Sequence, residues 1–247
     1  MSDFTLHGPL DTTPEVLLAG EDTGAPSERL RHGNARVAAL LVGTRRVDGG
    51  DWSDWLPFYR RRLPYNEAHL VCLEFLPGAR RLHAAVCEYA LVQTLRERFR
   101  VEVPLITTNA FLHCRERQQV VLQVRQGSLY GNGEAGLFGG GMQAFGPQGR
   151  EGDGDLLTAL QRELREETGV VIDQAAIGRA PLWWATEHCV GDRLTGSLQF
   201  NRYGVPVTAD TLDRLLDLHR QQSLEEGGIL VMDVRGLADW LTGQQPG

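Results

Sequence analysis

Lysine is absent from this chain: all 25 basic residues among its 247 are arginines. Enzymes that form a Schiff base through lysine, nucleotide-binding loops that end in a lysine, and protein kinases are therefore excluded. Any positive charge that a reaction needs must come from arginine or from a bound metal ion. A biased genomic composition also explains the missing lysine, because arginine serves a solvated surface equally well.

Membrane-spanning and export signals are also missing. No apolar run approaches the roughly 18 residues that cross a bilayer, and residues 1–10 lack a basic segment followed by an apolar one. The cysteines are widely spaced and form no CxxC pair: Cys72, Cys87, Cys114 and Cys189. We expect a cytoplasmic protein with reduced thiols and no membrane partner.

What is present is typical of a globular protein, with 42% hydrophobic and 23% charged residues. Residues 1–104 hold 13 Arg against 14 acids, a net charge of −1, and residues 105–247 hold 12 Arg against 18 acids, a net charge of −6. The acidity therefore belongs to the second half of the chain. This balance argues against nucleic acid as a partner.

The natural seam is Val103-Pro104, which divides the chain into a small α+β extension and a larger domain. Apolar periodicity and turn residues predict the elements of the extension. They are an irregular stretch over 1–34, a strand over Arg36–Gly43, a strand over His69–Leu76 and a helix over Leu82–Phe99.

Strands and helices interleave beyond the seam, which favours an α/β fold with a mixed sheet covered by helices. Two strands, Leu105–Cys114 and Gln119–Val124, are predicted to form a hairpin. Later elements are a helix over Asp155–Thr168, an extended piece from Val170, strands over Leu182–Glu187 and Leu194–Val207, a helix capped by Thr208 and running to about Leu224, a strand over Ile229–Val234 and a short helix over Leu237–Leu241.

Three carboxylates crowd one face of the helix predicted over Asp155–Thr168. Glu163, Glu166 and Glu167 stand at positions i, i+3 and i+4, where like charges repel. Such a helix is either simply solvated or gathers a divalent cation, and hard Mg²⁺ or Mn²⁺ accepts oxygen ligands of this kind. Gly169 follows where a helix end favours a left-handed residue.

The segment Arg162–Val170 (RELREETGV) resembles the second half of the Nudix box, Gly-x5-Glu-x7-Arg-Glu-U-x-Glu-Glu-x-Gly-U with U aliphatic, and matches all seven specified positions. The first half departs from the pattern, because Gly154 stands where the box has its first Glu and Gln148 where it has its Gly. An insertion within Phe145–Asp155 restores the register. The turn Gly139–Gly141 then opens the box.

This resemblance implies an α/β/α sandwich and Mg²⁺-dependent (or Mn²⁺-dependent) hydrolysis of a diphosphate linkage. It also implies site residues. Glu163, Glu166 and Glu167 would hold the metal with help from a backbone carbonyl near Gly140, and Arg162 would orient the carboxylates. The first Glu of the box pairs with the Arg in the family, and here its stand-in would be Glu151, Asp153 or Asp155.

Members of the family commonly draw a further Glu, as base or ligand, from a loop late in the domain. The first choice for this residue is the adjacent pair Glu225 and Glu226, of which we expect Glu226 to be catalytic. The second choice is Glu187. Two adjacent acids before a Gly-Gly turn also fit an ordinary solvated loop.

The sequence therefore predicts a metal-dependent pyrophosphohydrolase acting on a small-molecule nucleoside diphosphate derivative. The alternative is a catalytically silent Nudix-fold protein that senses a nucleotide. Residues 1–104 carry no catalytic motif, so we expect them to form a homodimer contact or to close one side of the substrate pocket.

Overall fold

The computed structural model describes residues 3–19, 25–64, 66–125, 135–145, 152–188, 196–221 and 227–241. The chain divides into two compact units. The first unit comprises Met1–Thr107, Gly141–Ala159 and Trp183–Phe200, and the second comprises Thr108–Gly140, Leu160–Leu182 and Asn201–Gly247. The contacts within these units do not show that either part of the chain folds independently. The division into domains 1–104 and 105–247 therefore stays a prediction.

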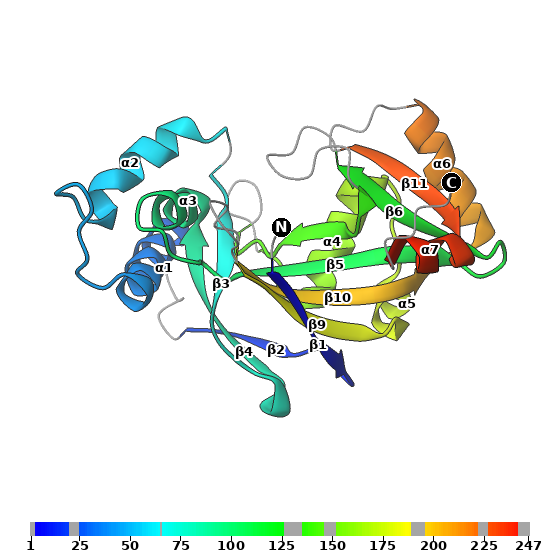
Figure 1. The fold of residues 1–247 in the computed structure, drawn as a ribbon, viewed down its shortest axis with the longest axis horizontal. Helices are drawn as coiled ribbons and strands as arrows, with labels where there is room; N and C mark the ends of the chain where they lie inside the picture. The colour runs from blue at the N-terminus through cyan, green and yellow to red at the C-terminus, as the bar shows by residue number, and fades with distance from the viewer. Residues whose placement is uncertain are drawn as a thin grey trace. The chain divides into compact units, whose positions relative to one another are not determined.

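Strands and helices alternate along the chain, and Figure 1 labels most of them. Up to residue 104 the described elements are β1 (Asp3–Leu10), β2 (Glu15–Leu18), α1 (Pro26–Leu41), α2 (Trp52–Arg62), β3 (Ala68–Leu76), the 3-10 turn η1 (Pro77–Ala79), β4 (Arg81–Glu88) and α3 (Tyr89–Glu97). Beyond it they are β5 (Leu105–Cys114), β6 (Gln119–Arg125), β7 (Ala135–Gly136), β8 (Phe138–Gly141), α4 (Leu156–Thr168), α5 (Gln174–Arg179), β9 (Leu182–His188), β10 (Ser197–Pro206), α6 (Ala209–Gln221), β11 (Gly227–Asp233) and α7 (Val234–Leu241). Among the described helices, none is long and apolar enough to cross a membrane.

The strands pair in both directions, which confirms the expected mixed sheet and the α/β class. The hydrogen-bonded order is β1-β9-β10-β5-β3-β4-β2, and β6, β7, β8 and β11 pair off this path. Strand β2 runs parallel to β4, whereas β3 pairs with β4, and β6 with β5, β7 and β11, in antiparallel fashion. Parallel and antiparallel ladders together make a mixed sheet.

The N-terminal part of the extension differs from the sequence prediction. Residues 1–34 were expected to be irregular, but they contain β1, β2 and the first half of α1. The strand predicted over Arg36–Gly43 is wrong, because residues 36–41 continue α1 and Val42 and Gly43 form the turn at its end. The residues that α1 buries are Gly33, Asn34, Val37 and Ala38. This repeat of three and four places one face of a helix on the core, and the short apolar run alone conceals it.

The helix predicted over Leu82–Phe99 is wrong in its first half. Arg81–Glu88 forms β4, which pairs along its whole length with β3, and only Tyr89–Glu97 is helical, as α3. Arg80 takes a left-handed conformation (φ 55°) and reverses the chain between β3 and β4. The apolar residues of β4 fit a helical spacing equally well, so pairing with β3 decided the outcome. Figure 1 shows β3 and β4 beside α1 and α3, which pack on them.

Most elements predicted beyond residue 104 are confirmed. The hairpin of β5 and β6 has its turn at residues 115–118, and β9, β10, α6, β11 and α7 lie where expected within a few residues. Thr208 caps α6 through a bond from the Thr211 amide to its Oγ1 at 3.1 Å. The piece after Val170 is not a strand, and the short helix α5 follows it.

The thiols match the expectation of scattered, reduced cysteines where the structure describes them. Cys72, Cys87 and Cys114 are free, while Cys189 lies outside the described residues. Burial raises the pKa of the Cys72 thiol to about 12, with Glu74 adding to the effect. Thiolate is the nucleophile and the metal ligand, so Cys72 is a packing residue.

A buried carboxylate ties the helices of the first unit to β4. Glu88 is 3% exposed, and it accepts bonds from the Arg60 Nε and Nη2 atoms at 2.8 and 2.6 Å. Asn34 of α1 and Asn66 also donate to it, at 2.5 and 2.8 Å. Burial raises the pKa of Glu88, but the bonds from Arg60, Asn66 and Asn34 outweigh burial and hold it below the ordinary value.

We predict that Glu88→Gln lowers the free energy of unfolding at pH 7 by about 1–3 kcal/mol, because the charged acceptor of these bonds is lost while Arg60 remains half-exposed and can hydrate. Since the folded-state pKa of Glu88 is depressed, its contribution is present above the unfolded-state pKa and is lost as pH falls through the folded-state pKa. Chemical denaturation at pH 7 and at acid pH measures both effects.

The matched control is Glu74→Gln, which removes an exposed carboxylate from β3 in the same unit. We expect it to change the unfolding free energy by less than about 0.5 kcal/mol. Equal effects of the two substitutions at pH 7 would contradict the structural role of Glu88.

Candidate functional site

Helix α4 carries the three carboxylates predicted from the sequence, and both of its ends are defined. Asp155 accepts a bond from the Thr158 amide at 2.7 Å and so caps the first turn, as expected. Gly169 ends the helix with φ 71°, a conformation that favours glycine. On its inner face, Leu160 and Leu164 are fully buried. The carboxylates of α4 therefore stand on a helix whose position is set by packing.

Arg162 brings two of the predicted ligands together. Its Nη1 atom lies 2.7 Å from Glu163 Oε1 and 3.0 Å from Glu166 Oε2. The side chains of Arg162 and Glu163 are 15% and 13% exposed, whereas that of Glu166 is 45% exposed. Because both contacts go to one nitrogen atom, the carboxylates of Glu163 and Glu166 converge on a single positive group, and one of them faces solvent.

Gly140 on β8 packs directly against Glu163. A Cβ atom at Gly140 would lie 2.7 to 2.9 Å from the carboxylate of Glu163, closer than a side chain tolerates. Gly139 beside it has φ 136°, and a Cβ there would lie 2.1 Å from the Thr108 carbonyl. Glycine is thus required at position 139, where a Cβ would meet backbone, whereas at position 140 the Glu163 side chain would have to move. Residues 139–141, expected to form a turn, belong to β8 and present its backbone to the acidic face of α4.

Glu167 accepts hydrogen bonds from groups on β6 and β8, whereas Glu163 and Glu166 contact Arg162. Glu167 is 8% exposed and accepts bonds from Gln123 Nε2 at 2.6 Å and from the Gly139 amide at 2.7 Å. Glu167 therefore connects α4 to β6 and to β8. Two of its acceptor positions are occupied by protein donors.

Gln123 is a site residue that the sequence interpretation did not name. It is 6% exposed on β6 and follows three apolar residues that are almost fully buried, Val120, Val121 and Leu122. A polar side chain inside such a strand needs a hydrogen-bonding partner. This requirement is the only feature of the local sequence that points to Gln123. The partner itself, Glu167, is 44 residues away in the sequence and only the fold identifies it.

The residues proposed to replace the first Glu of the box have different positions. Asp153 is buried and accepts a bond from the Gln143 amide at 2.8 Å, and Asp155 is the cap of α4. Gly154 has open space around its Cα. Glu151 lies outside the described residues, so its role stays a prediction.

The candidates for a general base are only partly described. Glu225 and Glu226 lie outside the described residues. Glu187 lies on β9 in the first unit, where Ser197 Oγ and Gln199 Nε2 each donate to it at 3.1 Å. The choice between these residues stays a prediction.

The donors around α4 suit a divalent cation in their chemistry. Carboxylate oxygens and a backbone carbonyl are what Mg²⁺ and Mn²⁺ prefer, and Glu163 and Glu166 already converge on a positive group. In the described part of the chain, however, no group of three or more His, Cys, Asp or Glu side chains is arranged to hold a metal ion. On α4, the Glu167 carboxylate accepts its bonds from Gln123 and Gly139.

We predict that Gly139→Ala destabilises the protein by about 1–3 kcal/mol, because its Cβ would lie 2.1 Å from the Thr108 backbone carbonyl and because φ 136° strains any residue but glycine. Thermal unfolding measures the effect. Gly154→Ala is the matched control, since its methyl group meets nothing within 4 Å, and it should unfold within about 0.5 kcal/mol of the parent protein. Equal stability of the two variants would contradict the close contact of Gly139 with the Thr108 carbonyl.

Comparison with known proteins identifies a family for the part of the chain that contains this site. A profile of the NUDIX domain matches residues 104–205. A solved structure, that of DR0079 from Deinococcus radiodurans, is similar over 58% of this chain and 75% of that one, at 16% identity and with a TM-score of 0.31. No curated protein matches the chain. The matched range contains Gly140 and all of α4. Residues 104–205 of this chain are a NUDIX domain, the domain of hydrolases that act on pyrophosphate bonds and generally use divalent metals such as Mg²⁺.

Proposed function

We propose that the chain is a Mg²⁺-dependent or Mn²⁺-dependent pyrophosphohydrolase that cleaves the diphosphate linkage of a nucleoside diphosphate derivative. The observation that carries this proposal is the convergence of Glu163 and Glu166 on one nitrogen atom of Arg162, beside Gly140, within a NUDIX domain. Two carboxylates placed in this way can bind the same positively charged group.

Each residue on α4 has a separate part in this proposal. Glu163, Glu166, Glu167 and the carbonyl of Gly140 are the groups that would hold the metal ion. Arg162 keeps the first two carboxylates in place and offsets their repulsion, since it contacts both. Glu166 is the most exposed of the three acids and therefore the one most accessible to a substrate. A bound divalent cation supplies charge that offsets the phosphate oxygens and lowers the pKa of a coordinated water.

In the reaction a water oxygen forms a bond to one phosphorus atom, and the bond from that phosphorus to the bridging oxygen breaks. The bridging oxygen leaves with the electron pair as part of the second phosphate. A carboxylate that accepts the water proton assists the attack. We assign this task to Glu226, with Glu225 and Glu187 as the alternatives.

A specific observation favours the second candidate function, a silent NUDIX-type protein that senses a nucleotide. Glu167 is engaged by Gln123 and Gly139, and Gly154 replaces the first Glu of the box. Release of Glu167 from these donors would cost about two hydrogen bonds to a charged group. The same bonds equally serve to position β8 beside α4, so we retain the enzyme as the proposal.

The test is hydrolysis of a substrate panel with Mg²⁺: ADP-ribose, NADH, nucleoside triphosphates, dinucleoside polyphosphates and nucleotide sugars. We expect turnover of at least one nucleoside diphosphate derivative and a loss of about a hundredfold or more in kcat for Glu166→Gln, because a charged group that acts on the reacting phosphate is removed. Omission of the metal should abolish turnover.

The control is Asp217→Asn, which removes an exposed carboxylate from α6 in the same unit. Its turnover should equal that of the parent protein. Binding of a panel member without turnover would support the sensing protein and overturn the enzyme.

A further inference from the structure

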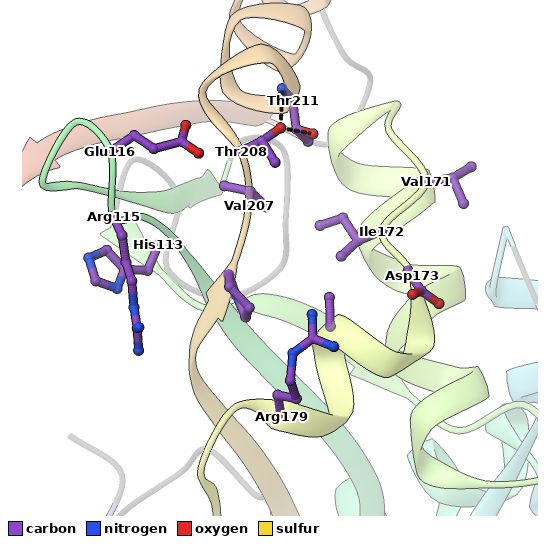
Figure 2. A pocket seen from close by; sticks show the side chains of 12 residues that line it. His113, Arg115, Glu116, Val171, Ile172, Asp173, Arg179, Val207, Thr208 and Thr211 are labelled. Atoms are coloured by element: carbon purple, nitrogen blue, oxygen red, sulfur yellow. Dashed lines mark hydrogen bonds between the residues drawn. The ribbon is translucent and has the colours of Figure 1, made fainter.

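Two neighbouring hollows in the second unit share a pair of arginines. One, of about 480 Å³, lies between the end of β5, the segment after α4, α5 and the start of α6, and Figure 2 shows its lining. The other, of about 460 Å³, is lined by Arg115, Arg179, Ala180, Pro181, Gly204 and Pro206. Arg115, Arg179 and Pro206 belong to both. Neither lining includes Gly140 or any carboxylate of α4.

Among the described residues that line the second hollow, only the two arginines are charged. Arg115 stands in the turn after β5 and Arg179 in the last turn of α5, and both side chains are exposed. In the part of the chain that the structure describes, neither guanidinium has an ion-pair or hydrogen-bond partner. This sets them apart from Arg60, Arg117 and Arg162, each of which contacts a carboxylate.

The acids in the first hollow are already engaged at helix ends. Glu116 accepts a bond from the Ala209 amide at the start of α6, and Asp173 accepts one from the Ala175 amide at the start of α5, at 3.2 Å. A carboxylate at a helix N-terminus is stabilised by the helix dipole and by the free amides there. Glu116 and Asp173 therefore do not neutralise Arg115 or Arg179 through a direct contact.

Two further groups make the region suited to an anion. The buried Arg202 guanidinium donates to the carbonyls of Gly178 and Ala180 at 3.0 and 2.7 Å. Because Ala180 lines the second hollow, a third positive charge lies next to its lining. His113 lines the first hollow, and within the described residues its buried Nε2 atom has no hydrogen-bond partner. Burial and the charge of Arg115 lower the pKa of His113, which favours the uncharged ring, and an uncharged imidazole still offers a hydrogen bond.

We propose that Arg115 and Arg179 form an anion-binding site for a phosphate group, either free or as the phosphomonoester of a small molecule, separate from the candidate catalytic residues. Planar guanidinium groups on two elements can each donate more than one hydrogen bond to phosphate oxygens. The hollows leave room for a small organic group attached to the phosphate. This site does not depend on the proposed hydrolase activity.

The experiment is calorimetric titration of the full chain with inorganic phosphate and, in a second arm, with ribose 5-phosphate, in the presence of a chelator that removes divalent cations. The variants are Arg115→Gln and Arg179→Gln. The control is Arg214→Gln, which replaces an exposed arginine on α6 that lines neither hollow. We expect each test variant to bind about tenfold or more weakly than the parent, and the control to bind equally.

Thermal unfolding gives a second readout. Without phosphate, all three variants should unfold close to the temperature of the parent, and phosphate should raise that temperature in the parent and in Arg214→Gln but not in the two test variants. A stronger effect of the ribose phosphate arm would identify the phosphomonoester as the better ligand. Equal binding by all variants, equal binding of acetate, or loss of phosphate binding in Glu166→Gln would overturn the proposal, the last because phosphate would then occupy the candidate catalytic site.

Discussion

The hydrogen bonds of the Glu167 carboxylate hold the candidate site together. One carboxylate on α4 receives a donor from β6 and another from Gly139 of β8, so three segments meet at a buried charge. A buried carboxylate is costly unless donors satisfy it, and this cost makes the arrangement specific. With β8 held there, Gly140 lies against Glu163, and Arg162 contacts both Glu163 and Glu166.

The first unit uses the same physical device in another place. Glu88 is buried between α1, α2 and β4 and is satisfied by Arg60, Asn34 and Asn66. In both units a carboxylate whose charge must be compensated joins elements that are distant in sequence. A chain without lysine relies on arginine and amide donors for this compensation, and arginine suits it because its planar fork binds a carboxylate through two bonds, as Arg60 does.

The absence of lysine thus has a structural meaning beyond the chemistries that it excludes. Most arginines with described partners serve carboxylates, as Arg162 and Arg117 do, or backbone carbonyls, as Arg202 does. Arg115 and Arg179 differ because the nearby acids cap helices instead of meeting them. Where positive charge is left over in an otherwise acidic half of the chain, a ligand of opposite charge is the natural complement.

Local signals were sufficient where an element is specified by its own residues. The α4 helix, with its cap Asp155, its stop Gly169 and its acids at i, i+3 and i+4, could be predicted because each signal lies within one segment. The hairpin of β5 and β6 is a similar case. In the extension, Val37 and Ala38 belong to a helix and Leu82 to a strand, although the apolar pattern around each allowed either structure. There the choice depended on long-range pairing between β3 and β4 and on helix packing against them.

The sequence by itself determined that residues 162–170 form a carboxylate-rich helix end of the Nudix type, because helical spacing and the glycine stop are properties of one short segment. Only the tertiary structure decided how the carboxylates are used. It separated Glu167, which is buried against Gln123 and Gly139, from Glu163 and Glu166, which share Arg162. The physical reason is that a carboxylate takes the donors which the surrounding strands bring to it, and those strands lie tens of residues away along the chain.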